Sequence, residues 1–392
     1  MIRVGLAGFG MAGRVFHAPL ISSVEGLELA AVVERNSDTA AARYPGITVY
    51  RSLEAMLADT SLGLFVLATP NGTHFLLAKE LLKSRKNVVV DKPMTLTSAE
   101  AAELIGLARE HNVLLAPFQS RRWDSDFLTL QKLLHEGSLG RLVAFESRLD
   151  RWRPAPLTER LWKESPEAGG GKLLDLGPHL VDQALDLFGK PEGVSAEVVR
   201  EKDGPGVDDA FTIRLRYGDS RVGVSFPDSC QVADSLVVAS TSGDRFRDAA
   251  NRESQYPGFI VTLGANSLSL PAAPRFHLRG TKGGYVKNGV DPQEAALNRI
   301  TQITDPAWGQ EPAANWGVLH VGIEGGSVTR PVPALPGDYR LYYAGIRDAL
   351  LGKAPPPVTG IDGWRVARVL EWAAESSEKR CEIACDWRDE PK

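Results

Sequence analysis

The stretch Val4-Gly5-Leu6-Ala7-Gly8-Phe9-Gly10-Met11-Ala12-Gly13 decides the fold of the first part of this chain. Its apolar start predicts a parallel strand that is buried on both faces, and the strand passes directly into the pattern Gly-x-Gly-x-x-Gly. In such a unit Gly8 permits a tight turn, Gly10 lets the backbone approach a pyrophosphate, and Gly13 lets the next helix pack closely on the sheet. The helix N-terminus then favours an anion, because its N–H groups are free.

A second apolar run, Leu27–Val33, strengthens this interpretation over that of a merely structural glycine-rich turn. The run predicts a strand that ends at Glu34, which lies 21 residues after Gly13. An acidic side chain at about this spacing binds the hydroxyls of the adenosine ribose in dinucleotide-binding folds. We therefore predict a dinucleotide site at the N-terminus.

The composition is that of an ordinary globular protein, with 392 residues, 43% hydrophobic and 24% charged, which is enough for two domains. A net charge of −4 offers no excess of positive charge for nucleic acid or an anionic membrane, so we expect a small-molecule partner. The chain has three cysteines, and Cys381 and Cys385 have no histidine nearby, which predicts reduced thiols in the cytoplasm and no metal site. No apolar run reaches about 18 residues, so no transmembrane helix is expected.

Residues 1–120 alternate short apolar runs with helix-like segments, which predicts an α/β Rossmann domain built on a parallel sheet. Its expected strands are 2–7, 28–33, 64–68, 87–90 and 113–116, and its expected helices are 12–23, 37–43, 52–58, 73–84 and 98–111. Pro19 is expected to kink or restart the first helix.

Residues 121–392 predict a second α/β domain with an open, mainly antiparallel sheet. We expect a helix that ends near Glu136, a final helix over 361–378, and a long ordered excursion over 301–338 that lacks helical periodicity. The expected strands are 141–149, 194–199, 210–217, 221–226, 235–240, 259–263 and 283–287.

Two strands of the first domain end in polar residues, at Thr69-Pro70-Asn71 and at Asp91-Lys92-Pro93. Ligands of open α/β sheets lie outside the carboxyl ends of the strands, so both places are candidates. Thr69-Pro70-Asn71 is also consistent with a simple turn, and His74 with a packing residue. A lysine fixed between a buried strand and a proline favours a positioned ammonium group at Lys92.

The stretch Gly169–Asp182 carries the second group of polar residues. The spacing of Leu176, Leu180 and Leu187 predicts a helix with Pro178 in its first turn. Asp175 and His179 are then four residues apart on one face, an arrangement suited to acid and base chemistry at neutral pH. A capping aspartate and a core histidine would give the same spacing, and the sequence leaves both alternatives open.

The glycine pattern at 8–13, Asp91-Lys92-Pro93, and the order Gly-Gly-Gly, Asp175, His179 together resemble the Gfo/Idh/MocA family of NAD(P)-dependent oxidoreductases. The resemblance covers nearly the whole chain. Gln119–Phe127, Asp150–Pro154 and 283–294 are similar to a subgroup that includes scyllo-inositol dehydrogenases. The family's usual Glu-Lys-Pro is Asp-Lys-Pro here. Glu34 favours NAD slightly, but Arg35 offers a charge for the 2′-phosphate of NADP.

The resemblance implies hydride transfer between nicotinamide and a secondary alcohol of a cyclic polyol or sugar, in a cytoplasmic homodimer or homotetramer. It implies the catalytic residues Lys92, Asp175 and His179, with His179 as the base, Asp175 orienting and charging its imidazole, and Lys92 on the reacting oxygen. The expected cofactor-binding residues are Gly8, Phe9, Gly10, Met11, Ala12, Gly13, Glu34, Arg35, Thr69, Pro70, Asn71, His74, Asp91 and Lys92. The expected substrate-binding residues, each of which is equally suited to packing between the domains, are Arg121, Arg122, Trp123, Asp150, Arg151, Trp152 and Trp162.

Two other functions remain open at this point. A non-catalytic regulator of the same fold would bind the nucleotide, but it would not need Lys92, Asp175 and His179 together. A glycoside-cleaving enzyme that uses tightly held NAD is the other, and release of an aryl alcohol from a glycoside would distinguish it.

Overall fold

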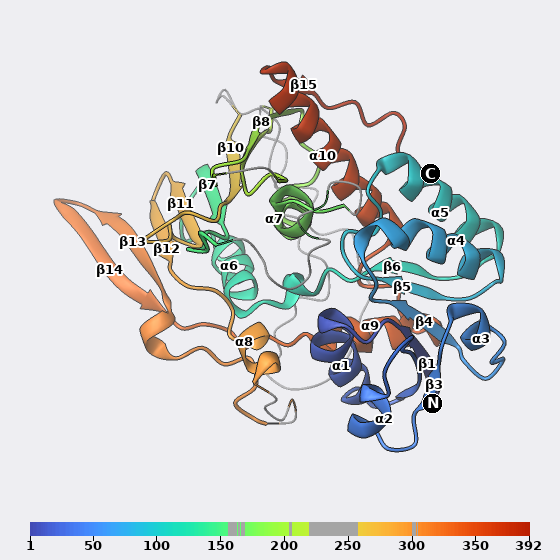
Figure 1. Ribbon diagram of the computed structural model, residues 1–392. Helices are drawn as coiled ribbons and strands as arrows, with labels where there is room; N and C mark the ends of the chain where they lie inside the picture. The colour runs from blue at the N-terminus through green and yellow to red at the C-terminus, as the bar shows by residue number, and fades with distance from the viewer. Residues whose placement is uncertain are drawn as a thin grey trace.

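The structure, a computed structural model, describes residues 1–155, 163, 165, 169–203, 206–218, 258–299, 303 and 305–392. Within them the chain forms a six-stranded and a nine-stranded sheet, each with its own helices. Helix α7 (Lys172–Phe188) lies near the centre of the molecule, between the two sheets (Figure 1). The expected combination of a Rossmann domain with a second α/β domain is confirmed.

The first sheet is parallel throughout and has the strand order β3-β2-β1-β4-β5-β6. This order reverses between β1 and β4, which is where doubly wound folds bind dinucleotides. All five expected strands are present, and the short β3 was missed because its three residues are not buried. The strands are β1 (Ile2–Ala7), β2 (Leu27–Val33), β3 (Thr48–Tyr50), β4 (Leu64–Leu67), β5 (Val88–Val90) and β6 (Leu115–Pro117).

The helical segment after the glycine pattern changes character along its length. It is π-helical over η1 (Gly13–His17) and becomes α-helical in α1 (Ala18–Ser22), where Pro19 lies in the first turn. Pro19 thus restarts the helix, as the sequence predicts, because proline is tolerated at a helix start. The remaining helical elements up to residue 123 are α2 (Thr39–Arg43), α3 (Leu53–Leu57), η2 (Asn71–Thr73), α4 (His74–Lys83), α5 (Ser98–Glu110) and η3 (Ser120–Trp123).

The second sheet has the order β14-β13-β12-β11-β7-β10-β9-β8-β15, and all its neighbours are antiparallel except β7 and β10. The predicted mainly antiparallel sheet is therefore confirmed, while the predicted strands 221–226 and 235–240 lie outside the described residues. The strands are β7 (Leu142–Arg148), β8 (Gly193–Val199), β9 (Ala210–Arg216), β10 (Ile260–Ala265), β11 (Phe276–Gly280), β12 (Gly283–Lys287), β13 (Gly317–Ile323), β14 (Gly326–Val332) and β15 (Ile383–Ala384).

Two sequence predictions in the second domain need correction. The excursion expected over 301–338 contains the β13–β14 hairpin, whose mostly exposed residues give no alternation of apolar and polar positions. Pro178 lies inside α7 and not in its first turn, because the helix begins six residues earlier, at Lys172. The helices of this domain are α6 (Ser125–His135), α7, α8 (Gln293–Asn298), η7 (Ala313–Asn315), α9 (Arg340–Leu350) and α10 (Gly360–Lys379).

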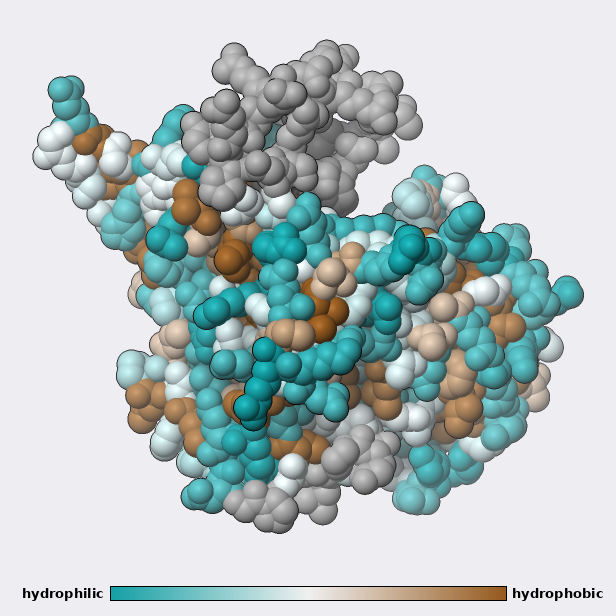
Figure 2. Space-filling view, turned by 90° about the horizontal axis from the view of Figure 1, so that it is seen from above, coloured by the Kyte–Doolittle hydropathy of each residue, from teal (hydrophilic) through white to brown (hydrophobic). Residues whose placement is uncertain are grey.

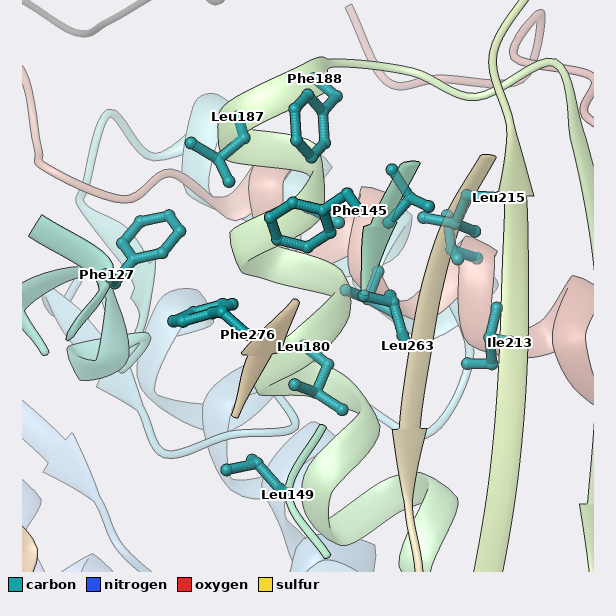
Figure 3. Close-up of a cluster of buried hydrophobic side chains, with 14 of the residues drawn as sticks. Phe127, Phe145, Leu149, Leu180, Leu187, Phe188, Ile213, Leu215, Leu263 and Phe276 are labelled. Atoms are coloured by element: carbon teal, nitrogen blue, oxygen red, sulfur yellow. The ribbon is translucent and has the colours of Figure 1, made fainter. Parts of the chain in front are cut away.

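Helix α7 packs its apolar face on the nine-stranded sheet. Leu180 and Phe188 of the helix lie against side chains of the strands, and the rings of Phe145 and Phe188 are 5.0 Å apart (Figure 3). Burying one such side chain stabilises the fold by about 1.5–3 kcal/mol. This packing fixes the position of α7 relative to the nine-stranded sheet, and therefore the position of the polar residues in its first two turns.

The last hundred residues return to the first sheet. Tyr342, Tyr343 and Ile346 of α9 are fully buried in the core of the six-stranded sheet, and Trp364 of α10 is buried beside α5 and β6. We keep residue 120 as the proposed boundary between the two domains. The C-terminal helices pack against both domains, so they link the two sides of a site that lies between them.

Candidate active site

A cavity of about 1430 Å³ opens at the carboxyl ends of β1, β2, β4 and β5 and extends to α7. Sites for a single ligand usually have about 300–1,000 Å³, so this cavity has room for a dinucleotide and a second molecule. Its wall combines the strand ends of the first sheet with residues of the second domain. A two-ligand reaction is compatible with that shape.

The glycine loop fits a pyrophosphate. A Cβ at Gly8, where φ is +99°, would lie 2.5 Å from the carbonyl oxygen of Ala68, so only glycine fits there. A Cβ at Gly10 would meet no heavy atom within 4 Å among the described residues. The backbone at Gly10 therefore faces open cavity, and the predicted residues Phe9, Met11 and Ala12 line the same region. Gly13 does not line the cavity.

Glu34 follows β2 and turns its carboxylate toward its own loop. Its Oε1 accepts hydrogen bonds from the hydroxyls of Ser37 at 2.6 Å and Thr39 at 2.5 Å, and its Oε2 accepts one from the N–H of Ala40 at 2.9 Å. Burial opposes ionisation of Glu34, but these hydrogen bonds outweigh it and hold its pKa below the ordinary value. Arg35 lines the cavity next to this loop.

The loops after β4 and β5 meet under the cavity. Thr69, Pro70 and Asn71 line the cavity, and the side-chain amide of Asn71 donates to the carbonyl oxygen of Gly169 at 2.9 Å, which joins the two domains. His74 is fully buried, with ring nitrogens 2.8 Å from Pro93 O and 2.9 Å from Thr69 O. Burial also lowers the pKa of His74. The ring of His74 thus binds the backbone of both loops, and His74 does not line the cavity.

Lys92 reaches from the end of β5 to the first turn of α7. Its Nζ donates to the carbonyl oxygen of Asp175 at 2.6 Å and lies 3.3 Å from Asp175 Oδ1. Lys163 Nζ donates to the same Oδ1 at 2.6 Å. Burial disfavours the charged carboxylate, but the two lysines outweigh it and hold the pKa of Asp175 far below its ordinary value. Asp175 is therefore an anion that holds two cations in place.

His179 lies one turn after Asp175 in α7 and also lines the cavity. Burial lowers its pKa well below the ordinary value, the charges of Lys92 and Arg121 lower it further, and Asp175 opposes them. Its Nδ1 is buried and has no hydrogen-bond partner among the described residues. The imidazole is therefore neutral at physiological pH and can accept a proton.

The expected link between Asp175 and His179 needs correction. The two side chains share a face of α7, but no hydrogen bond joins them in the part of the chain that the structure describes, because both lysines compete for Asp175. Asp175 acts on the imidazole through its charge only, which raises the pKa of His179.

Comparisons with known proteins assign the chain to a family. The family model "Oxidoreductase family, NAD-binding Rossmann fold" matches residues 2–118, and the model of the GFO/IDH/MocA C-terminal domain matches residues 127–234. The chain belongs to the Gfo/Idh/MocA oxidoreductase family. It is an NAD(P)-dependent oxidoreductase, and the glycine loop above fits that cofactor.

Several members of the Gfo/Idh/MocA family are similar over nearly their full length. The uncharacterized oxidoreductase YdgJ of Escherichia coli is 36% identical, over 97% of this chain and 98% of its own. The scyllo-inositol 2-dehydrogenase (NADP(+)) IolW of Bacillus subtilis is 31% identical, over 97% and 94%. The solved structure of yvaA from Bacillus subtilis superposes with a TM-score of 0.84 at 30% identity and covers 98% of both chains.

The predicted substrate residues of this family member lie in different places. Arg121 and Arg151 line the cavity, and Trp162 lies outside the described residues. The other predicted residues, Arg122, Trp123, Asp150 and Trp152, are not part of the lining. A motif of alternating arginines and aromatic residues indicates that a segment is polar and ordered, but it does not tell which side chains point inward.

Each of these four residues has a partner elsewhere. Arg122 binds Asp182 through two hydrogen bonds of 2.9 and 2.7 Å. Trp123 packs edge-on against Tyr342, with ring centres 5.8 Å apart. Asp150 accepts two hydrogen bonds from the guanidinium of Arg148. Trp152 is 53% exposed and pairs with Leu268 in an isolated bridge.

Several residues of the cavity wall were not predicted from the sequence. His17 is fully buried, hydrogen-bonds the hydroxyl of Tyr343 at 2.6 Å and has its Nε2 3.7 Å from Asp91. Burial opposes ionisation of Asp91, but the contact with His17 outweighs it, so the pKa of Asp91 is lowered. Lys163 and Lys172 belong to the wall as well. Lys172 adjoins the three glycines in the sequence, and this was a usable signal for it.

The described residues contain no helix long and apolar enough to cross a membrane. They also contain no cluster of three histidine, cysteine or carboxylate side chains suited to a metal ion.

Proposed function

We propose that this oxidoreductase transfers hydride between nicotinamide and a secondary alcohol of a cyclic polyol or sugar. The observation that carries the proposal is the meeting of Lys92, Asp175 and His179 in one cavity with the glycine loop. Similarity to a relative named as a scyllo-inositol 2-dehydrogenase supports a cyclic polyol. The nicotinamide, when bound, supplies or accepts the hydride.

The protein's own residues then handle the proton and the charge. His179 is neutral, so a ring nitrogen takes the proton of the substrate hydroxyl. Lys92 donates a hydrogen bond to that oxygen as it becomes a carbonyl, which stabilises the negative charge that develops on it. Asp175 fixes Lys92 from the other side, so the ammonium group keeps its place between substrate and helix.

A substrate panel tests this proposal. Inositols, other polyols and aldoses are offered with NAD and with NADP, and the absorbance of the reduced nicotinamide is followed. We expect reduction of at least one cofactor form by a polyol or sugar. Release of an aryl alcohol from an aryl glycoside, with no net change of the cofactor, would contradict hydride transfer as the net reaction.

We also propose a homodimer or homotetramer in the cytoplasm. The β13–β14 hairpin projects from the body in both views (Figure 1 and Figure 2), and its residues Ile323 and Val328 are 55% and 49% exposed. Ile260 on the same sheet is also exposed. Exposed apolar side chains on a projecting sheet favour a partner surface. Light scattering at micromolar concentration tests the assembly, and a monomer contradicts it.

Free Cys381 and Cys385 support a reducing compartment.

A further inference from the structure

Three cations of the second domain line the cavity without a counter-ion. Arg151 and Lys172 are half-buried, and Arg153 is exposed. Within the described ranges these three side chains have no hydrogen bond and no ion pair, although the backbone N–H groups of Arg151 and Arg153 bind Asn266 O and Ser267 O. A cation that is partly removed from water without an opposite charge is unfavourable. These side chains therefore lack a partner that a ligand can supply.

The carboxylates that come nearest to these cations are already engaged. Asp175 binds Lys92 and Lys163, with 2.6 Å between Lys163 Nζ and Asp175 Oδ1. Glu294 accepts a hydrogen bond of 2.5 Å from Arg121. Each carboxylate is thus paired with another cation. Glu294 attracts Arg151 and Asp175 attracts Lys172 through their charge, but no direct ion pair joins them among the described residues.

Two further carboxylates of the wall bind backbone groups. Asp208 Oδ2 accepts the N–H of Leu173 at 2.7 Å, at the start of α7. The carboxylate of Asp209 accepts the N–H groups of Glu201 and Lys202 at 2.8 and 3.1 Å. These carboxylates hold the loop next to α7 in place, and no ion pair links either of them to Lys172 among the residues that the structure describes.

The charges of this region act on one another. Burial lowers the pKa of Lys172, the charges of Arg151, Lys202 and Arg153 lower it further, and Asp175 opposes them. Burial also lowers the pKa of Arg151, with Arg153 acting in the same direction and Glu294 against it. Like charges have thus been brought together around one space, which favours an anion in that space.

The position of Lys172 along α7 relates it to the reacting groups. Lys172, Asp175 and His179 are spaced by three and four residues, so they share one face of the helix. Lys172 and His179 are seven residues apart, which is roughly 10 Å along the helix axis. A lysine side chain is long enough to bridge part of that distance, so one sugar-sized molecule can contact both ends.

We infer that the substrate carries a carboxylate or a phosphate group, which Arg151 and Lys172 bind while a hydroxyl-bearing carbon faces Lys92 and His179. The inference rests on the proposed function and narrows its substrate from any polyol to an acidic one, such as a sugar acid or a sugar phosphate. Hydrogen bonds between charged groups are about twice as strong as neutral ones, so the anionic group supplies orientation as well as affinity.

Binding to the enzyme loaded with reduced cofactor tests the inference without oxidation of the probes. Calorimetric titration uses D-glucuronate and D-glucose 6-phosphate as probes for the two kinds of anion, and D-glucose and scyllo-inositol as neutral counterparts. We expect one of the two anions to bind at least about tenfold more tightly than D-glucose, and this advantage to shrink as salt is added. The two anionic arms distinguish a carboxylate site from a phosphate site.

Variants then assign the effect to these two side chains. Lys172→Gln and Arg151→Gln should each reduce the advantage of the anion by about tenfold, while the neutral probes change less than about twofold. Arg151→Lys keeps the charge and should retain most of the advantage. Lys132→Gln is the control, because this cation is 55% exposed on α6 and is absent from the cavity wall. Thermal unfolding verifies that each variant is folded.

Three results would overturn the inference. The first is that the neutral probes bind as tightly as the anions, or that neither anion binds at millimolar concentration. Another is an anion advantage that Lys172→Gln and Arg151→Gln leave unchanged. The last is a loss of NADPH affinity, measured by its fluorescence, in place of a loss of anion affinity, which would assign the cations to the cofactor. Failure of hydride transfer with all substrates, alongside preserved anion binding, refutes the proposed function and not the anion site.

Discussion

The two ends of the cavity are built in different ways. The cofactor end consists of short strand-to-helix loops, in which residues next to one another in the sequence are next to one another in the site, such as 8–12 and 69–71. The end at α7 collects Lys92 from the loop after β5, Asp175 and His179 from α7, and Arg151 from the segment that follows β7. A local motif is thus sufficient for one end, whereas the other depends on how the two domains pack.

The largest expected effect concerns the reacting groups at the α7 end. We expect His179→Ala and Lys92→Met each to lower the rate of hydride transfer by about 10²–10⁴, or about 3–5 kcal/mol of barrier. The affinity for NAD(P) should stay nearly the same, because the glycine loop is untouched. Stopped-flow measurement of hydride transfer on folded protein decides it. Rates near those of the wild type in both variants would refute the mechanism.

The second effect distinguishes a residue that packs the domains from one that binds substrate. Arg122 lies among Asp182, Asp186 and Asp362 at 2.7, 3.1 and 3.8 Å. Burial raises the pKa of Asp182 to about 6, although Arg122 opposes this shift. Arg122→Gln leaves buried carboxylates without their cation, so we expect a loss of about 3–5 kcal/mol in the free energy of unfolding. Urea denaturation measures it.

A matched control for Arg122 is Arg3→Gln. Arg3 pairs with Glu28 on the surface, where the side chains are 40% and 44% exposed, and it does not line the cavity, so its removal should cost only about 0–1 kcal/mol. If Arg122→Gln is as stable as this control and instead raises the KM for the polyol, then Arg122 contacts the substrate, as the sequence analysis expected.

The sequence was sufficient for the parallel sheet and for the cofactor end because both depend on local rules. A buried apolar strand followed by Gly8, Gly10 and Gly13 leaves little choice of local structure, and parallel strands alternate with helices because each crossover needs one. The position of Lys92 between the buried strand Val88–Val90 and Pro93 likewise predicted a positioned ammonium group, and Lys92 lines the cavity.

The remaining parts depend on contacts between distant residues. Asp175 was expected to orient and charge the imidazole of His179, but Lys163, twelve positions earlier, binds the carboxylate of Asp175. Arg122 and Asp150 were expected in the substrate pocket, and both found counter-ions outside it. A spacing of four on a helix predicts that two residues share a face, but it does not tell which third residue comes between them. The β13–β14 hairpin was missed because its exposed strands have no buried face to produce alternation.

A smaller effect is expected at the cofactor end, in the choice between NAD and NADP. The sequence favours NAD slightly through Glu34, but its two carboxylate oxygens already accept three hydrogen bonds from its own loop. We therefore expect the two cofactors to bind within about tenfold of each other, or 1.4 kcal/mol. Arg35→Gln should weaken NADP alone. Fluorescence titration measures both, and a preference far above tenfold in either direction would contradict this expectation.

The smallest effect is the dependence of activity on pH, and it tests the electrostatic account of His179. Burial and the charges of Lys92 and Arg121 lower its pKa, so it binds no proton at pH 6.5, where an unfolded histidine is half protonated. For alcohol oxidation, kcat/KM should therefore change less than about twofold from pH 8 to pH 6.5, measured at saturating cofactor. Asp175 raises the pKa of His179, so Asp175→Asn should lower that pKa and shift the acidic limb of the kcat/KM profile to lower pH. The same shift affects stability. Below about pH 6.5 the unfolded chain takes up a proton at His179 that the folded chain does not, so the free energy of unfolding should decrease as the pH falls. An acidic limb centred at or above pH 6.5 that disappears in a folded His179→Gln protein would show that the imidazole is not held neutral.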